Sequence, residues 1–159
     1  MNFFNNNDPY SNLSCVENVT KYVLRDKTRP GFVMNRYSGC IGVNDLYKAG
    51  SEFMYVKRYF GQMFGRHLKH FYITFGEHDH MTPELAYILA YHISMYYSGR
   101  FQIIFSVHEE KKNLHIHFVV NTVSYIDGKK LHEGYDQLYG LESYCEYCYN
   151  ALIKSQFDN

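Results

Sequence analysis

Two histidines separated by a single residue occur in a segment with the composition of a β-strand. The segment LHIHFVVN covers residues 114–121 and carries His115 and His117. Because side chains alternate between the two faces of a strand, both imidazoles are expected on one face, and the apolar residues between them on the other. Their attachment points would lie about 7 Å apart, so the rings can converge on one ion.

A third histidine, His108, follows the apolar segment FQIIFSV of residues 101–107. A hairpin formed by the two segments would bring His108 opposite the pair. Three neutral imidazoles suit a divalent transition metal and leave coordination positions open for substrate oxygens. We therefore predict a metal site made of His108, His115 and His117. For the pair alone, strand histidines satisfied by hydrogen bonds would be the favoured interpretation.

The six other histidines fit a metal site less well. They are interpreted as structural or solvated side chains: His67, His70, His78, His80, His92 and His132. The four cysteines, Cys15, Cys40, Cys145 and Cys148, are interpreted as reduced thiols, because the CEYC pair has no second pair to complete a structural zinc site.

The charges of the chain are unevenly distributed. The 159 residues have a formal net charge of zero, but residues 21–70 contain ten Lys and Arg against three acidic residues. That segment carries 10 − 3 = +7, and the remainder carries −7. Folded onto one face, such a segment can track phosphates. The 17 Tyr and 12 Phe are also compatible with stacking on unpaired bases, although packing explains most of them.

The pattern along the chain predicts one α+β domain over residues 14–159, with a central antiparallel sheet flanked by helices, after a mobile lead-in over residues 1–13. Ser14 and Glu17 fit a capping box, and Thr82 followed by Pro83 fits a helix start. Residues 26–44 are expected to form a long loop. The expected helices cover residues 15–25, 45–60, 83–98 and 135–153, and the expected strands cover 70–75, 101–107 and 114–123.

The chain contains no apolar run long enough for a membrane-spanning helix, and its first residues lack the features of a secretory signal. We therefore expect a cytoplasmic protein with no membrane segment.

Five segments, spread over residues 15–153, resemble in order the motifs of the Mob-type relaxases, which are mobilisation nucleases of the HUH endonuclease superfamily. One is the spacing H-x6-H-x-H that ends at His117, followed by Asn121. KYVLRDKT resembles the helix that carries the family's nucleophilic tyrosine. The other three are YSGCIGVNDLYKAGSEFMYVKRYFGQ, KHFYITFGEHDHMTPELA and NTVSYIDGKKLH. The tyrosine precedes the histidines, whereas typical replication initiators and single-strand transposases of the superfamily place it after them.

The resemblance implies an enzyme that nicks one DNA strand at an origin of transfer in a plasmid or integrative element. Tyr22 would be the nucleophile and would form a 5′-phosphotyrosine intermediate, with Tyr37 as the second choice. The three histidines would hold Mn²⁺ or Mg²⁺, with Zn²⁺ as a further option. The partners would be single-stranded DNA and, in some systems, accessory mobilisation proteins. The residues expected to contact DNA are Arg25, Lys27, Lys57, Arg58 and Asn121.

Other interpretations remain open at this level. A catalytically degenerate relaxase fold would bind single-stranded DNA without cutting it. Another HUH enzyme, either a replication initiator or a transposase, would use the same metal chemistry. A metalloprotein unrelated to DNA is the most distant alternative. A cleavage assay separates the first of these from an active relaxase.

Overall fold

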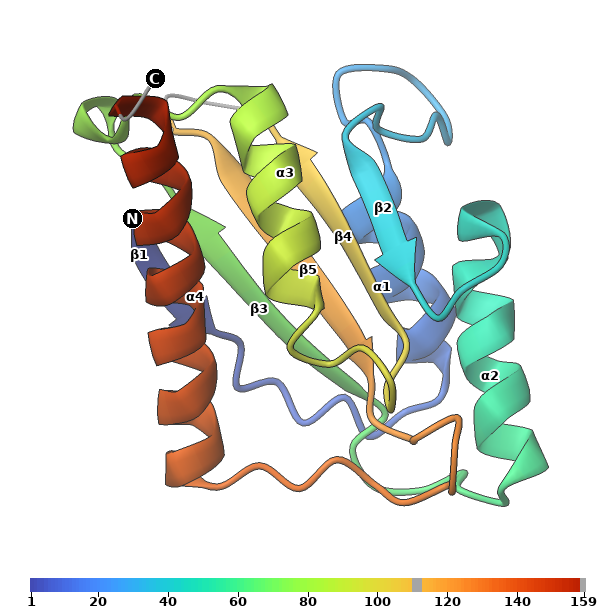
Figure 1. The fold of residues 1–159 in the computed structure, drawn as a ribbon. Coiled ribbons are helices and arrows are strands. Elements are labelled where there is room, and N and C mark those ends of the chain that lie inside the picture. Colours follow the sequence, from blue (N-terminus) through green and yellow to red (C-terminus); the bar gives the residue numbers. More distant parts are fainter. Residues whose placement is uncertain (110–112, 158–159) are drawn as a thin grey trace.

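The computed structural model describes residues 1–109 and 113–157 and contains a five-stranded sheet of order β1-β3-β5-β4-β2 (Figure 1). Every neighbouring pair of strands is antiparallel, which confirms the predicted α+β fold. The strands are β1 (Asn2–Asn5), β2 (Ser38–Ile41), β3 (Leu68–Thr74), β4 (Ile103–His108) and β5 (His115–Asn121). The helices are α1 (Ser14–Leu24), α2 (Ala49–Tyr59), α3 (Pro83–Ser94) and α4 (Tyr135–Phe157), with short 3₁₀ turns η1 (Leu46–Lys48) and η2 (Glu77–Asp79).

The helices cover the two faces of the sheet in pairs (Figure 1). α3 and α4 pack on one face in an apolar cluster that includes Ile116, Phe118 and Val120 of β5. α1 and α2 pack on the other face in a second cluster that includes Val119. Side chains of β5 therefore alternate between the two layers, as the sequence pattern predicts, and the histidines lie on the α1/α2 side.

The central strand β5 is paired along both edges. β4 and β5 form the predicted hairpin, and its register places His108 directly opposite His115. On the other edge, His115 pairs with Thr74 of β3, and His117 pairs with Tyr72. A strand held on both sides offers a rigid support for side chains that must converge on one point.

Both edge strands differ from the sequence-based expectation. Residues 2–5, expected in a mobile lead-in, pair with β3 instead. β2 lies within the expected loop of residues 26–44 and pairs with β4. Each of these strands has only four residues, which is too short for an alternation of apolar and polar residues to predict it from the sequence. At Gly39 the absence of a side chain is required, since a Cβ there would collide with the ring of Phe105.

The helix starts are set by local side chains. The Thr82 hydroxyl accepts a hydrogen bond from the Leu85 amide and Pro83 is the first residue of α3, as predicted. The capping box predicted at Ser14 and Glu17 is wrong, because the Asn12 side chain accepts from the Ser14 amide and Glu17 pairs with Lys21. In the part of the chain that the structure describes, no helix is sufficiently long and apolar to span a membrane.

Candidate functional site

His108, His115 and His117 gather where β4 ends and β5 begins. Each offers a ring nitrogen, and these nitrogens lie within 4.8 Å of one another. The ring centres are 4.9 Å apart for His108 and His117, and 5.0 Å apart for His115 and His117. The hairpin register places His108 opposite His115, and strand alternation places His117 on the same face as His115. The structure therefore brings the three predicted ligands together.

Each of the three rings has one nitrogen engaged by the protein. The Nε2 of His108 lies 2.7 Å from the Val23 carbonyl oxygen, and the Nδ1 of His115 lies 3.1 Å from the Asn113 carbonyl oxygen. Because a carbonyl only accepts, these nitrogens carry the protons, and the lone pairs reside on His108 Nδ1 and His115 Nε2. His108 Nδ1 is buried and has no hydrogen-bond partner among the described residues.

The third ring, that of His117, faces another histidine. Its Nδ1 lies 3.0 Å from the Nε2 of His70. A metal-binding histidine commonly directs its second nitrogen to a protein group in this way, which sets the ring orientation. The three imidazoles, one of them with an unpartnered buried nitrogen, thus fit a divalent transition metal.

The electrostatics of the cluster keep the rings neutral. The pKa of His108 is lowered to about 4 and that of His117 to about 2, chiefly by burial, with smaller contributions from Lys27 and the neighbouring histidines. An uncharged imidazole presents a lone pair, whereas a protonated one repels a cation. At neutral pH, the two rings are therefore in the form that binds a metal.

Tyr22 lies beside this cluster in the last turn of α1. Its ring centre is 6.5 Å from that of His117 in an edge-on arrangement, and its side chain remains 55% exposed. The Lys27 ammonium lies 3.2 Å from the Tyr22 hydroxyl oxygen and 4.3 Å from the centre of its ring. The next residue, Val23, accepts the hydrogen bond of His108, so one helical turn joins the tyrosine to a predicted ligand.

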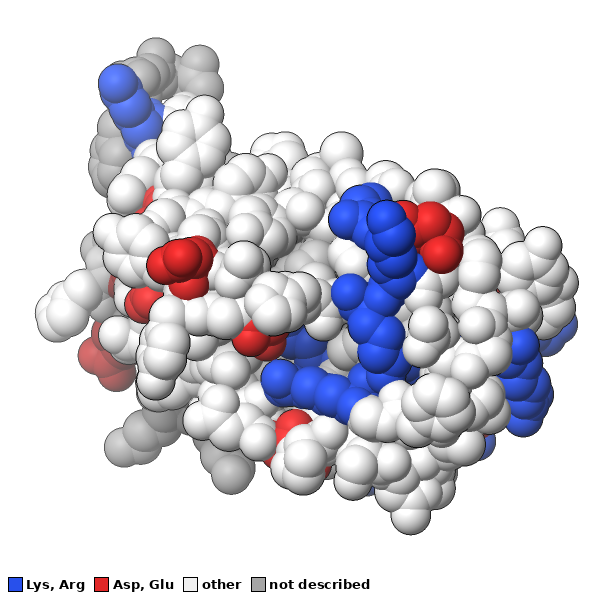
Figure 2. Space-filling view, turned by 90° about the horizontal axis from the view of Figure 1, so that it is seen from below, with Lys and Arg blue, Asp and Glu red and all other residues white. Residues whose placement is uncertain are grey.

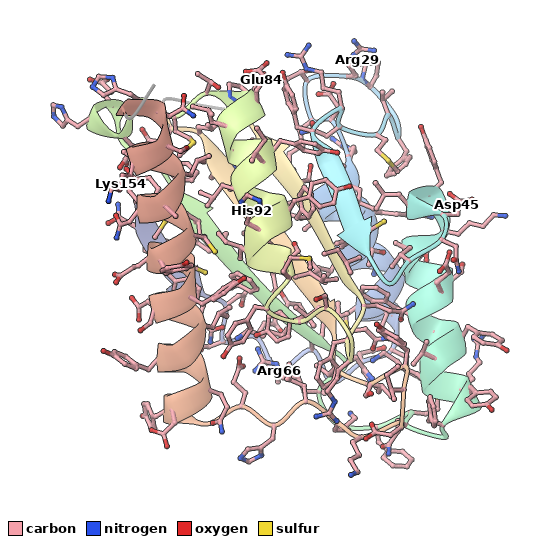
Figure 3. All side chains as sticks on the ribbon, viewed as in Figure 1. Arg29, Asp45, Arg66, Glu84, His92 and Lys154 are labelled. Carbon is pink, nitrogen blue, oxygen red and sulfur yellow. The ribbon has the colours of Figure 1, made fainter. Side chains whose placement is uncertain are left out.

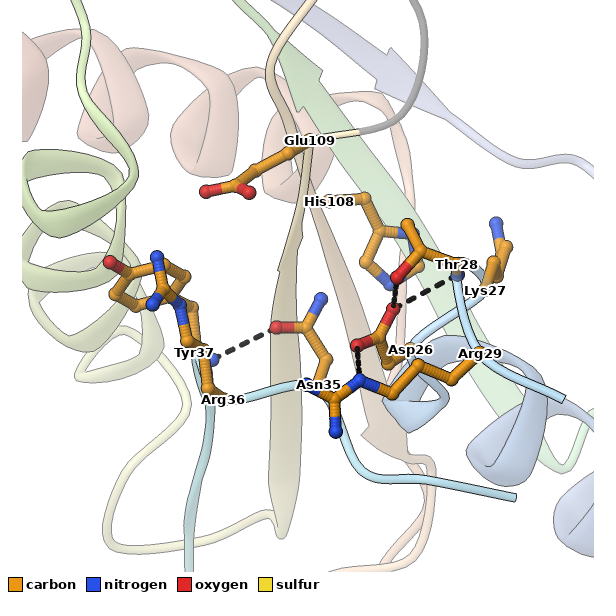
Figure 4. Close-up of a pocket in the computed structure, with 9 residues that line it drawn as sticks. All are labelled: Asp26, Lys27, Thr28, Arg29, Asn35, Arg36, Tyr37, His108 and Glu109. Carbon is orange, nitrogen blue, oxygen red and sulfur yellow. Dashed lines mark hydrogen bonds and ion pairs between the residues drawn. The ribbon is translucent and has the colours of Figure 1, made fainter. Parts of the chain in front are cut away.

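Two hollows flank Lys27 at this end of the sheet. The larger, of about 420 Å³, is lined by Lys21, Tyr22, Arg25, Lys27 and Phe32 with Asn18 and Gly31. The smaller, of about 190 Å³, is lined by residues 26–29 and 35–37 with His108 and Glu109 (Figure 4). Two predicted DNA contacts, Arg25 and Lys27, thus adjoin the tyrosine and the histidines. Positive charge around a concave surface suits an anionic chain.

The loop between α1 and β2 is held in shape by its own side chains (Figure 4). The Asp26 carboxylate accepts hydrogen bonds from the amide and hydroxyl of Thr28 and pairs with Arg29 at 3.5 Å. Asn35 accepts from the Tyr37 amide and donates to the Val107 carbonyl oxygen. This network gives the rim of the smaller hollow a defined form.

Tyr37, the second choice for the nucleophile, has a different environment. Its hydroxyl donates a hydrogen bond to the Glu84 carboxylate at the start of α3. This bond, with a smaller effect of burial, raises the pKa of Tyr37. A hydroxyl that is engaged in this way and resists ionisation is less suited to nucleophilic attack than that of Tyr22.

Lys57 and Asn121 do not reach the surface. Both side chains are fully buried, and Lys57 donates to the Asn121 amide oxygen and to the His67 carbonyl oxygen, each at 2.7 Å. The prediction that these two residues contact DNA is therefore wrong. They instead hold α2 against the end of β5 that lies away from the histidines.

The basic segment of residues 21–70 is divided between the two ends of the sheet. Arg29 lies at the histidine end with Glu84, whereas Arg66 lies at the opposite end (Figure 3). Arg58, a predicted DNA contact, is exposed in the last turn of α2. Figure 2 looks onto the end opposite the histidines and shows Lys and Arg side chains gathered there as well. The +7 segment therefore does not fold onto a single face of the molecule.

His70 is the residue near the cluster that sequence reasoning interpreted as merely structural or solvated. It lies on β3, and its contact with His117 depends on the pairing of β3 with β5. Its position two residues before Tyr72, the strand partner of His117, is the only signal for this contact, and that pairing is not evident before the sheet is assembled.

The comparisons with known proteins agree with this geometry. The family model described as relaxase, MobA/VirD2-like, nuclease domain matches residues 22–150, a range that includes Tyr22 and all three histidines. A search of curated proteins gave no significant match, and a search of solved structures gave none either. Because the match covers most of the chain, this protein belongs to the MobA/VirD2-like relaxase family and comprises its nuclease domain.

Proposed function

We propose that this protein is a metal-dependent DNA relaxase that nicks one strand at an origin of transfer and becomes linked to the new 5′ end through Tyr22. The observation that carries the proposal is that two neighbouring residues in the last turn of α1 contact the histidine cluster. Tyr22 lies beside the His117 ring, while the adjacent Val23 carbonyl holds His108 by its Nε2. The last turn of α1 thus positions both the proposed nucleophile and one of the three predicted metal ligands, in a chain of a nuclease family.

The reaction follows from the groups present. The Tyr22 hydroxyl loses its proton and its oxygen attacks the scissile phosphorus. The bond from phosphorus to the 3′ oxygen breaks, and that oxygen takes up a proton to leave a 3′-hydroxyl. A divalent ion held by the three histidines would stabilise negative charge on the non-bridging phosphate oxygens. The phosphotyrosine ester retains the bond energy, so the reverse reaction reseals the strand.

The cationic groups around Tyr22 support the choice of substrate. Lys27 places its ammonium 3.2 Å from the tyrosine oxygen, where phosphate oxygens must approach. Arg25 and Lys21 line the same hollow, and Phe32 offers an aromatic ring there for an unpaired base. We propose single-stranded DNA as the partner, Mn²⁺ or Mg²⁺ as the ion with Zn²⁺ as an alternative, and mobilisation of a plasmid or integrative element, with accessory proteins, as the context.

The experiment is a covalent trapping assay. The full chain is incubated with Mn²⁺ and single-stranded DNA carrying candidate origins, and denaturing electrophoresis then detects a protein–DNA adduct. Tyr22→Phe should bind DNA but form no adduct, because it lacks only the attacking oxygen. Tyr55→Phe is the matched control, since Tyr55 is 68% exposed on α2 and lies outside the site.

Mass spectrometry of the adduct assigns the linked residue. An adduct on Tyr37, or full activity of Tyr22→Phe, would overturn the choice of nucleophile. Binding of single-stranded DNA without any cleavage by the wild-type protein would favour a degenerate binding module instead.

A further inference from the structure

The smaller hollow contains two charged side chains of opposite sign, Arg36 and Glu109, that form no hydrogen bond or ion pair with any described residue (Figure 4). The polar side chains around them are bound to one another, to the backbone or to Glu84: Asp26, Thr28, Arg29, Asn35 and Tyr37. The rim is therefore held by its own contacts, and the two remaining charges are available to a ligand.

Both charges act on the same part of the hollow. The Arg36 guanidinium carbon lies 4.5 Å from the centre of the Tyr37 ring. The pKa of Tyr37, which is raised chiefly by its hydrogen bond to Glu84 and by burial, is also influenced by the charges of Arg36 and Glu109. A donor group and an acceptor group thus lie near one hydroxyl without being paired with each other.

This hollow lies across Lys27 from the proposed nucleophile. Lys27 lines both hollows, whereas Tyr22 lines only the larger one and His108 only the smaller one. In phosphoryl transfer, the attacking and leaving oxygens lie on opposite sides of the phosphorus. A phosphate that Tyr22 attacks at Lys27 therefore has its leaving 3′ oxygen, and the nucleotide that carries this oxygen, on the side of the smaller hollow.

The two charges suit the base of that nucleotide. A guanidinium only donates hydrogen bonds, and a carboxylate accepts them, for example from the exocyclic amino group of cytosine. Adenine, cytosine and guanine each carry an amino group as well as acceptor atoms. Thymine has no amino group, and its carbonyl oxygens would repel a carboxylate.

We propose that the smaller hollow binds the nucleotide immediately 5′ of the nick, where Arg36 holds its base and Glu109 selects a base with an amino group against thymine. This inference rests on the proposed function and deepens it, because it assigns a specificity-determining residue to the strand that Tyr22 cuts. Glu109 contributes by accepting a hydrogen bond from the base and takes no part in the bond exchange at phosphorus.

The covalent trapping assay tests the proposal with four strands that differ only in the nucleotide 5′ of the nick, whose position is read from the 3′-hydroxyl product of the wild-type protein. We expect the wild type to form adduct about 10-fold more slowly with thymine than with the best amino-bearing base. Glu109→Gln should speed the thymine strand relative to the others, because its amide can donate to a thymine carbonyl and accept from N3–H. Misfolding cannot produce such a gain.

Two further variants complete the set. Arg36→Gln removes a donor that does not distinguish the bases, so adduct formation should slow with every strand while the order of the four bases is kept. Glu146→Gln, at an exposed glutamate of α4, is the matched control for the loss of one negative charge and should keep both the rates and the order.

The outcomes separate this inference from the proposed function. No adduct from the wild-type protein with any strand would overturn the proposed function, and the inference with it. An adduct that forms equally fast with all four bases, or discrimination against thymine that persists in Glu109→Gln, would overturn base selection by Glu109 while the chemistry of Tyr22 stands. Wild-type rates in Arg36→Gln would overturn the role of Arg36.

Discussion

The histidines and Asn121 lie at opposite ends of the β5 face that packs toward α1 and α2, and the side chains of His108 and Asn121 differ in whether all their polar atoms are hydrogen-bonded. At one end, His108 keeps a buried Nδ1 without a hydrogen-bond partner among the described residues, beside a hollow and an exposed tyrosine. At the other end, Asn121 accepts from Lys57 and donates to Gln102 and to the Phe53 carbonyl. Polar residues of this one strand face thus belong to the proposed metal site at one end and to a hydrogen-bonded contact between α2 and the sheet at the other.

The packing of the helices explains the difference. Near Asn121, α2 lies against the sheet and contributes both the buried ammonium of Lys57 and the carbonyl of Phe53. Near the histidines, the last turn of α1 supplies one carbonyl, from Val23, and leaves the tyrosine beside it exposed. A buried polar group with all its partners contributes to stability, whereas one with an open position can take a ligand.

The largest effect that separates the two ends is expected in metal binding. His115→Ala and His117→Ala each remove one of three ligands, and Mn²⁺ affinity should fall more than about 100-fold by calorimetry, beyond the effect of losing a supporting partner. The fold should persist, because Ile116 and Phe118 still fill the opposite layer. Undiminished affinity in both variants would place the metal elsewhere.

At the Asn121 end, a substitution should lower the free energy of unfolding and leave the metal affinity unchanged. Asn121→Ala removes hydrogen bonds on both sides of the amide and leaves Lys57 without one of its acceptors. We expect the free energy of unfolding to fall by about 3 kcal/mol and Tm by roughly 10 °C in calorimetric melting. Its Mn²⁺ affinity should match that of the wild type, and a loss of affinity would show that the two ends are coupled.

The buried lysine predicts a pH signature of the structural end. Burial, with a smaller contribution from Lys130, lowers the pKa of Lys57 to about 7 in the folded protein. Between about pH 7 and the unfolded value of about 10.4, the unfolded chain therefore binds more protons than the folded protein. The penalty for burying this group is full below pH 7 and is relieved as the pH rises through that window.

Denaturant unfolding of the wild type and Lys57→Met measures this contribution. The unfolding free energy of the wild type minus that of Lys57→Met should increase as the pH rises from about 7.5 to about 10. Lys129→Met, at a lysine whose side chain is 77% exposed, should show no such trend. A flat difference for Lys57→Met would mean that the lysine titrates normally despite its burial.

The smallest expected effect concerns the salt dependence of DNA binding. Removing one cation that neutralises a phosphate should flatten the slope of log affinity against log salt by about 0.7 for single-stranded DNA. Arg25→Gln and Lys27→Gln, which change the hollow beside Tyr22, should each show this change in fluorescence anisotropy titrations. Arg58→Gln in the last turn of α2 tests the remaining predicted contact, and a flatter slope there would mean that the strand extends to the far end of the sheet.

Features that depend on neighbouring residues in the chain are predictable from the sequence alone. The spacing of His115 and His117 places them on one face because strand alternation is local, and a short connection makes the hairpin with His108 the simplest pairing. The start of α3 at Thr82 and Pro83 is equally local. The ordered motifs likewise predict the relaxase family, since each is a contiguous run of residues.

Features that depend on distant partners are decided only by the tertiary structure. Lys57 and Asn121 have the residue types of a DNA-binding surface, but the packing of α2 buries them against each other. β1 and β2 become strands because β3 and β4 offer free edges, which a four-residue segment cannot signal by itself. The contact of His70 with His117 joins residues 47 positions apart. Burial and the partner of each ring nitrogen are therefore properties of the assembled sheet, because both depend on groups that become neighbours only when the chain folds.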